Sequence, residues 1–188
     1  MTDTLRQYDK VVDSCREIFR QKIKDYGSSW RVLRPISIAD QIYIKAQRIR
    51  HIQLLGKQKV EDAPDNELRA IINYGIIALI QLTLDGEAPL ELSAEEATGY
   101  YSRMLGEVKR LMEDKNHDYG EAWREMSQES FIDLILMKLL RIRSILKNQG
   151  KTLVSEGIDA NFRDIVNYAV FSLIKMQENQ PDRPLNTP

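Results

Sequence analysis

The feature that most restricts the fold of this chain is an internal repeat. The segment Asp25-Tyr26-Gly27, with Trp30-Arg31 shortly after it, recurs with the same spacing as Asp118-Tyr119-Gly120 and Trp123-Arg124. Each copy holds one of the two tryptophans of the sequence. The correspondence continues downstream in the pairs Asp40/Asp133, Lys45/Lys138, Arg48/Arg141, Asn73/Asn167 and Tyr74/Tyr168. A repeat of this length predicts two equivalent structural units that share one core.

Each unit has the hydrophobic pattern of three helices. In the first unit, apolar residues recur at intervals of three and four up to Gly27, a residue typical of a helix C-terminus. Two more helices are expected, at 37–55 and from 62 or 65 to 84. The second unit repeats this plan: the capping-box spacing of Ser93 and Glu96 opens a helix to about 118, and helices at 130–149 and 159–176 follow. No segment alternates convincingly between apolar and polar residues, so we predict no sheet.

The expected fold class is therefore all-α, with six helices arranged as two tandem three-helix repeats in one pseudo-twofold helical bundle. We place repeat 1 at 1–84, a linker at 85–92, repeat 2 at 93–179 and a disordered tail at 180–188. One three-helix unit alone would bury little apolar surface, whereas two units facing each other can share a core. A homodimer of the whole chain is a further candidate assembly.

Composition narrows the function classes. The chain has 188 residues, of which 43% are hydrophobic and 29% charged, and its formal net charge is −1. Because sequence-independent capture of nucleic acid needs a basic face, this balance argues against broad nucleic-acid binding. No segment approaches the roughly 18 apolar residues of a membrane span, and the N-terminal segment lacks the apolar run of a signal peptide. We therefore expect a cytoplasmic protein without membrane contact, and we expect Cys15, the only cysteine, in the core.

Asp25 and Asp118 are the first candidates for chemistry. Each lies at the predicted C-terminus of a helix, where backbone carbonyls already carry partial negative charge and disfavour a carboxylate. One interpretation pairs these residues with Arg31 and Arg124 or places them in Asx-type turns. The other directs them into a cleft, where they would hold a metal ion or a polar ligand.

The repeated aromatic residues leave a similar choice. Tyr26 and Trp30 in the first unit, like Tyr119 and Trp123 in the second, follow a predicted helix end. Large aromatic side chains in such a loop commonly cover a core. They are also suited to stacking on a nucleobase.

Basic residues interrupt the second helix of each unit. Lys138 and Arg141 lie in a segment that is apolar on nearly every side, which predicts deep burial. A buried charge must be paired, hydrogen-bonded or bound to a ligand. Lys138 and Arg141, with their equivalents Lys45 and Arg48, therefore suit either a phosphate group or an ion-pair network.

An aspartate in the same helix has two interpretations. Asp133 follows Ser130 by three residues, as Asp40 follows Ser37, and this is the spacing of an N-terminal capping box. Asp133 and Asp40 are therefore expected either to cap their helices or to contribute a carboxylate to a polar site.

The third helix of the second unit carries Asp164, Asn167 and Tyr168 on one face. The first unit has Ala70 where the second has Asp164, although it keeps the asparagine and the tyrosine. A carboxylate in one copy fits a single active site in the second unit, and it fits neutral drift on a solvated face equally well. We take the second unit as the better candidate for chemistry.

Together these segments resemble the nucleotide modification associated domain family of small helical proteins. The resemblance rests on three blocks of the second unit: Lys115-Asn116-His117-Asp118-Tyr119-Gly120, then Lys138 with Arg141-Ile142, then Asp164-Ile165-Val166-Asn167-Tyr168-Ala169. The first unit matches the first block in part and lacks the acid of the third. Membership implies a link to nucleotide or modified-base metabolism. A more distant similarity is to all-helical nucleotide pyrophosphatases of the MazG type, which hold Mg²⁺ with Glu-x-x-Glu and Glu-x-x-Asp pairs.

Two hypotheses follow. In the first, the protein binds a nucleotide and is a candidate Mg²⁺-dependent nucleoside triphosphate pyrophosphohydrolase. The metal ligands would be Asp118, Asp164 and Asp133, with Asp25 and Asp40 as weaker candidates. The nucleotide would contact Lys138, Arg141, Tyr119, Trp123, Asn167, Tyr168, Lys45 and Arg48. In the second hypothesis, the chain is a non-catalytic helical module for interaction or scaffolding, and the repeated residues serve caps, turns and ion pairs.

Overall fold

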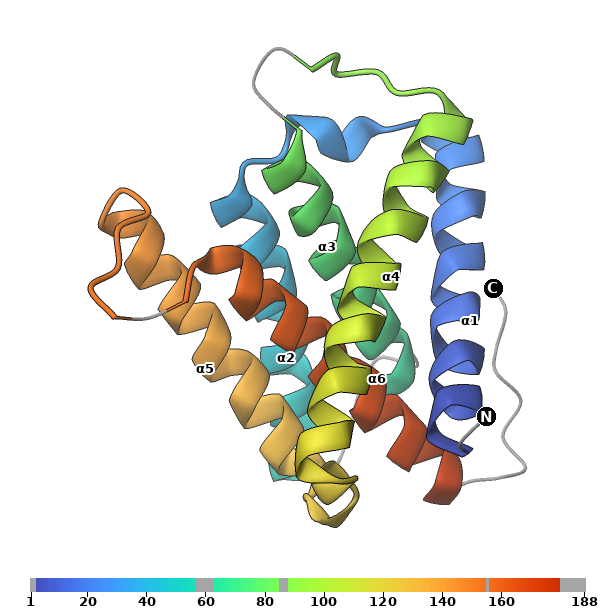
Figure 1. Cartoon of the computed structure of the whole chain (residues 1–188), viewed down its shortest axis with the longest axis vertical. Coiled ribbons are helices and arrows are strands. Elements are labelled where there is room, and N and C mark those ends of the chain that lie inside the picture. Colours follow the sequence, from blue (N-terminus) through green and yellow to red (C-terminus); the bar gives the residue numbers. More distant parts are fainter. Residues whose placement is uncertain (1–2, 57–62, 85–87, 155, 180–188) are drawn as a thin grey trace.

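The computed structural model describes residues 3–56, 63–84, 88–154 and 156–179. Every regular element within these residues is a helix, which confirms the all-α prediction. The main helices are α1 (Asp3–Tyr26), α2 (Pro35–Leu55), α3 (Pro64–Thr83), α4 (Ala94–Tyr119), α5 (Gln128–Lys147) and α6 (Ile158–Asn179) (Figure 1). Short 3-10 helices, η1 (Ser29–Val32) and η2 (Ala122–Glu125), follow α1 and α4. The expected disordered tail at 180–188 lies outside the described residues.

Local sequence sets several helix ends as expected. The chain leaves α1, α2 and α4 through Gly27, Gly56 and Gly120, each with a positive φ that strains any residue with a side chain. The capping box of α4 is formed in full. The Ser93 hydroxyl accepts a hydrogen bond from the backbone N–H of Glu96, and the Glu96 carboxylate accepts one from the backbone N–H of Ser93.

The two repeats interlock and do not form separate bodies. α3 packs against α6 through the centre, and α2 packs against α5 along one side (Figure 1). α1 and α4 lie next to each other on the other side, and each contacts the third helix of both repeats. The hydrophobic core is therefore continuous and takes side chains from both repeats.

Two reciprocal hydrogen bonds join the repeats across this core. The Tyr8 hydroxyl of repeat 1 donates to Asn167 Oδ1 of repeat 2 at 2.8 Å. Its equivalent, the Tyr101 hydroxyl of repeat 2, donates to Asn73 Oδ1 of repeat 1 at 2.6 Å. Both tyrosines are fully buried, so each hydroxyl needs the partner that the opposite repeat supplies. The same contact made in both directions is the signature of a twofold relation.

Two ion pairs between α2 and α5 show the same reciprocity. Arg143 Nη2 lies 2.7 Å from Asp40 Oδ1, and the equivalent pair, Arg50 Nε and Asp133 Oδ1, is separated by 3.7 Å. Arg143 also lies over the ring of Tyr43, 4.1 Å from its centroid. The acidic residue of each second helix therefore binds the last arginine of the other.

The capping interpretation of these aspartates is wrong. α5 begins at Gln128 with Ser127 as its N-cap, whose hydroxyl accepts a hydrogen bond from the backbone N–H of Ser130. α2 likewise begins at Pro35, whose fixed φ suits the first position of a helix. Asp133 and Asp40 thus lie inside their helices, where a side chain cannot reach the free N–H groups of the first turn.

The expected burial of α5 on nearly every side is also wrong. Asp133, Met137, Leu140 and Arg141 form an exposed face of the helix, whereas Lys138 is buried. The spacing of these four residues is that of one helix face. Only Lys138 therefore meets the expectation of a buried charge in this segment.

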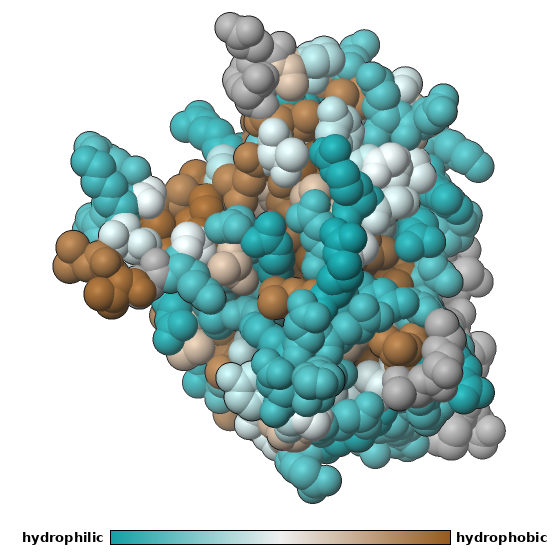
Figure 2. Space-filling view, in the orientation of Figure 1, coloured by the Kyte–Doolittle hydropathy of each residue, from teal (hydrophilic) through white to brown (hydrophobic). Residues whose placement is uncertain are grey.

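The face of the molecule in Figure 2 is mostly hydrophilic, with an apolar patch at its left edge over the loop that follows α5. Across the described ranges, no helix combines the length and the apolar character needed to cross a membrane. Cys15 is fully buried, as its position on the apolar stripe predicted.

Candidate functional site

The repeated turn after the first helix returns a tryptophan to the core in each unit. Trp30 in η1 and Trp123 in η2 are both buried. Trp30 lies beside Phe19, and Trp123 stacks on Phe171. In both repeats the indole N–H is buried without a hydrogen-bond partner among the described residues. Both tryptophans therefore cover the core, as the commoner of the two interpretations predicted.

The aspartates of this turn lie outside the core. Asp25 and Asp118 are exposed. The neighbouring arginines bind other groups: Arg31 donates to two carbonyl oxygens of the linker, and Arg124 pairs with two glutamates. In the described part of the chain, Asp25 and Asp118 are thus not the partners of Arg31 and Arg124.

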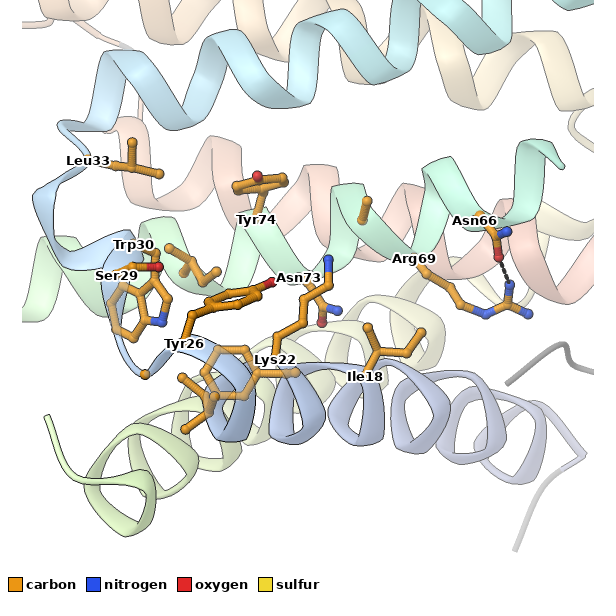
Figure 3. Close-up of a pocket in the computed structure, with 15 residues that line it drawn as sticks. Ile18, Lys22, Tyr26, Ser29, Trp30, Leu33, Asn66, Arg69, Asn73 and Tyr74 are labelled. Atoms are coloured by element: carbon orange, nitrogen blue, oxygen red, sulfur yellow. Dashed lines mark hydrogen bonds between the residues drawn. The ribbon is translucent and has the colours of Figure 1, made fainter. Parts of the chain in front are cut away.

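Repeat 1 contains a cavity of about 640 Å³ between α1, η1 and α3 (Figure 3). Tyr26 and Trp30 lie on its α1–η1 side, and Tyr74 lies across from them on α3. Small-molecule sites commonly occupy roughly 300–1,000 Å³ and combine apolar walls with a few polar groups. The polar side chains in this lining are Lys22, Tyr26, Ser29, Trp30, Asn66, Arg69, Asn73 and Tyr74.

One cation of this cavity is uncompensated. Lys22 is exposed at the cavity and reaches from α1 towards α3, and it has no ion-pair partner among the described residues (Figure 3). Arg69 is different, because its guanidinium is buried and donates to Asp65 at 2.8 Å and to Asn66 at 3.1 Å. The charge of Lys22 is therefore the one that remains available to a bound anion.

The equivalent space in repeat 2 is nearly filled, with only about 140 Å³ remaining. Phe171 occupies the position of Ile77 and stacks on Trp123, with ring centroids 4.3 Å apart and planes at 4°. Asp164 occupies the position of Ala70, and its Oδ1 lies 2.6 Å from Lys115 Nζ, the equivalent of Lys22. These two differences between the repeats each add a larger side chain at the repeat 2 cavity.

Asp164 is the counterion of two lysines. Its second oxygen lies 2.6 Å from Lys138 Nζ, and both Asp164 and Lys138 are buried. Burial alone would raise the pKa of Asp164, but the hydrogen bonds and charges of Lys115 and Lys138 outweigh it and hold the pKa below its ordinary value. For Lys115, burial alone would lower the pKa, but the hydrogen bond and the charge of Asp164 outweigh this effect. The pKa of Lys115 is therefore raised above its ordinary value. The carboxylate is therefore ionised and fully engaged at neutral pH.

The other residues proposed for repeat 2 are placed as follows. Tyr119, Trp123, Asn167 and Tyr168 line the 140 Å³ cavity together with Asp164. Asn167 already accepts a hydrogen bond from Tyr8 and donates one to the backbone of repeat 2. Tyr119 is 76% exposed, so it lies at the rim. The sequence pattern thus brings these residues together, around a space that is too small for a nucleotide.

The second helix of repeat 1 forms an ion-pair network. Lys45 Nζ lies 3.1 Å from a carboxylate oxygen of Glu67, and Arg48 binds the other oxygen. Glu67 on α3 is buried. Of the two roles open to Lys45 and Arg48, the structure thus shows ion pairing. The equivalent of Glu67 in repeat 2 is the uncharged Asn161.

The proposed magnesium ligands are not gathered at one place. Asp133 pairs with Arg50, Asp118 contacts His117 at 3.2 Å, and Asp164 binds two lysines. Nowhere in the described ranges do three His, Cys, Asp or Glu side chains form a group able to hold a metal ion. Because Mg²⁺ is often held by one or two carboxylates together with phosphate oxygens and waters, magnesium binding stays a prediction.

The difference between Asp164 and Ala70 predicted that the site lies in repeat 2. Of the two equivalent cavities, the larger lies in repeat 1, and its basic residues Lys22 and Arg69 were not proposed as site residues. A usable signal was present in the sequence: Ile77 is smaller than its equivalent Phe171, beside a tryptophan that both repeats keep.

The fold and the cavity together define an all-helical tandem-repeat protein whose first repeat holds a ligand-sized cavity. The chain belongs to the family described as Nucleotide modification associated domain 1, which matches residues 22–82 and 115–176, one region in each repeat. This confirms the family resemblance and the tandem duplication. Comparison with curated proteins and with solved structures found no match.

Proposed function

We propose that this protein binds a nucleotide in the cavity of repeat 1. The observation that carries the proposal is the combination of an aromatic cavity of about 640 Å³ with a lysine that has no ion-pair partner among the described residues. The base would lie against Tyr26 and Trp30, and the phosphate would lie near Lys22. The link of the family to nucleotide modification supports the same ligand class.

The aromatic walls suit a nucleobase. Stacking of a base on an aromatic side chain contributes roughly 1–3 kcal/mol in single-strand binding proteins. The cavity lining also includes polar side chains that a base or sugar could contact, among them Ser29 and Asn73.

The proposed function is binding, without catalysis. Within the described lining of the cavity there is no aspartate, glutamate, histidine or cysteine, the side chains that most often act as general base or nucleophile. No observation on the described residues specifically favours a scaffold role either.

Replacing Lys22 with glutamine is expected to weaken nucleotide binding about tenfold or more, because one charge-assisted contact to phosphate is lost. Thermal shift and isothermal titration with nucleoside mono-, di- and triphosphates will measure the effect, since a ligand that binds only the folded state raises its stability. Lys24→Gln, two residues along α1 and outside the cavity lining, is the matched control and should bind as the unmodified chain does. Absence of stabilisation by every nucleotide at millimolar concentration would contradict the proposal, as would equal weakening in both variants.

A further inference from the structure

A second cavity, of about 890 Å³, lies on the side of repeat 2 that includes the exposed face of α5. Its walls are α5, the loop residues 148–154 and Glu156, Asn161 of α6, and Arg50 of α2. It shares no lining residue with the cavity of repeat 1. The two spaces are therefore separate sites.

The repeats differ at a position that decides how the basic residues of this cavity are paired. In repeat 1, Glu67 neutralises both Lys45 and Arg48. In repeat 2, Asn161 stands at the position of Glu67 and carries no charge. Lys138 is paired with Asp164, but the exposed Arg141 has no ion-pair partner in the described part of the chain. A cation that repeat 1 binds internally is thus open to solvent in repeat 2.

Asn161 adds an unsatisfied acceptor to the same cavity. Its side chain is 4% exposed, and its Nδ2 donates to the carbonyl oxygen of Gly157 at 2.8 Å. Its Oδ1 is buried and has no hydrogen-bond partner among the described residues. Buried polar atoms are rarely left unpaired, and Asn161 belongs to the lining of this cavity, so a ligand group that donates a hydrogen bond would satisfy this acceptor.

The charge of the lining favours an anion. Arg50, Lys138, Arg141 and Lys151 are the basic residues, and Asp133 and Glu156 are the acidic ones. Asp133 lies 3.7 Å from Arg50, and Lys138 is already bound by Asp164. The cations without an ion pair in the described chain are Arg141 and Lys151, and guanidinium and ammonium groups together form a common phosphate site.

We propose that this cavity is a second binding site, for a small phosphate monoester that carries a hydroxyl group. The phosphate contacts Arg141 and Lys151, and the hydroxyl donates to Asn161 Oδ1. Repeat 2 thus binds a ligand on its α5–α6 side, whereas repeat 1 binds one between α1 and α3. The second site does not depend on the first.

The test is isothermal titration of the full chain with ribose 5-phosphate, a phosphate monoester with hydroxyl groups and no base. One molecule per chain is expected to bind at the α5–α6 site, and ribose without phosphate is expected not to bind. Arg141→Gln should weaken binding about tenfold or more, and Arg103→Gln, an exposed arginine on α4, should have no effect. Asn161→Glu should abolish binding, because it recreates the internal ion pairs that Glu67 makes in repeat 1.

Three results would overturn the proposal: no binding at millimolar ribose 5-phosphate, equal affinities for the Arg141→Gln and Arg103→Gln chains, or unchanged affinity in folded Asn161→Glu protein. A fourth result would place the sugar phosphate in repeat 1 and also overturn the proposal, namely loss of binding in Lys22→Gln with none in Arg141→Gln. Circular dichroism of each variant will confirm that it is folded. Failure of nucleotide binding in repeat 1 would leave these outcomes unchanged.

Discussion

Replacing Asp164 with asparagine is expected to destabilise the folded chain by about 2–4 kcal/mol at neutral pH, because it leaves Lys138 buried beside a neutral group. The carboxylate lies 2.6 Å from both Lys115 and Lys138. The contribution of Lys115 is smaller, since its side chain is 48% exposed and solvent screens the pair. Chemical denaturation of the two proteins will measure the difference.

The loss of stability caused by Asp164→Asn should depend on pH. Because the folded-state pKa of Asp164 lies below its ordinary value, its stabilising contribution is complete above the ordinary pKa and is lost as the pH falls through the folded-state pKa. Because the pKa of Lys115 is raised, its contribution is present below its ordinary pKa and is lost only at strongly alkaline pH. The difference between the two proteins should therefore be constant between about pH 5 and pH 9 and should shrink below about pH 4.

Asp159→Asn provides a matched control for this prediction. Asp159 pairs with Arg163 at 2.6 Å, but the carboxylate is 49% exposed, so its removal should cost about 0.5 kcal/mol or less. Equal penalties for Asp164→Asn and Asp159→Asn would show that the buried Lys138 does not need its counterion.

The second large effect is expected when the repeat 1 cavity is given the side chains of repeat 2. The double variant Ala70→Asp/Ile77→Phe should lose nucleotide affinity by about 100-fold or more, since it removes both the space and the free cation. The introduced phenylalanine would stack on Trp30 as Phe171 stacks on Trp123. The introduced aspartate would pair with Lys22 as Asp164 pairs with Lys115. Titration calorimetry with nucleotides will measure the loss.

The double variant should remain folded, because repeat 2 accommodates the same pair of side chains in an equivalent place. Ile44→Phe is the control for added aromatic volume, since Ile44 is 61% exposed on α2 and outside the cavity. If the double variant binds nucleotides as tightly as the Ile44→Phe chain, the ligand does not occupy the repeat 1 cavity.

Much of the fold was predictable because its determinants are local. Helix periodicity, the glycines at helix ends and the capping box of Ser93 each act within a few residues. The internal repeat then predicted the pseudo-twofold arrangement. The equivalent hydrogen bonds of Tyr8 and Tyr101 confirm it.

The roles of the charged residues were less predictable, since they depend on contacts between distant segments. Asp40 and Asp133 have the local spacing of caps, yet each binds an arginine of the opposite repeat. Asp164 differs between the repeats as a catalytic residue would, yet its partners are two lysines on α4 and α5. A carboxylate that is found in one repeat only can therefore fill a cavity and pair with its lysine, as readily as it can bind a ligand there.

Nucleotide is expected to bind in repeat 1 and not in the equivalent place in repeat 2. The two tryptophans make this directly measurable, because Trp30 lines the open cavity and Trp123 the closed one. Nucleotides should be titrated into Trp123→Phe, which keeps Trp30, and into Trp30→Phe, which keeps Trp123, while tryptophan fluorescence is recorded. We predict saturable quenching of Trp30 and no change in Trp123. Quenching of Trp123 with a silent Trp30 would contradict the account.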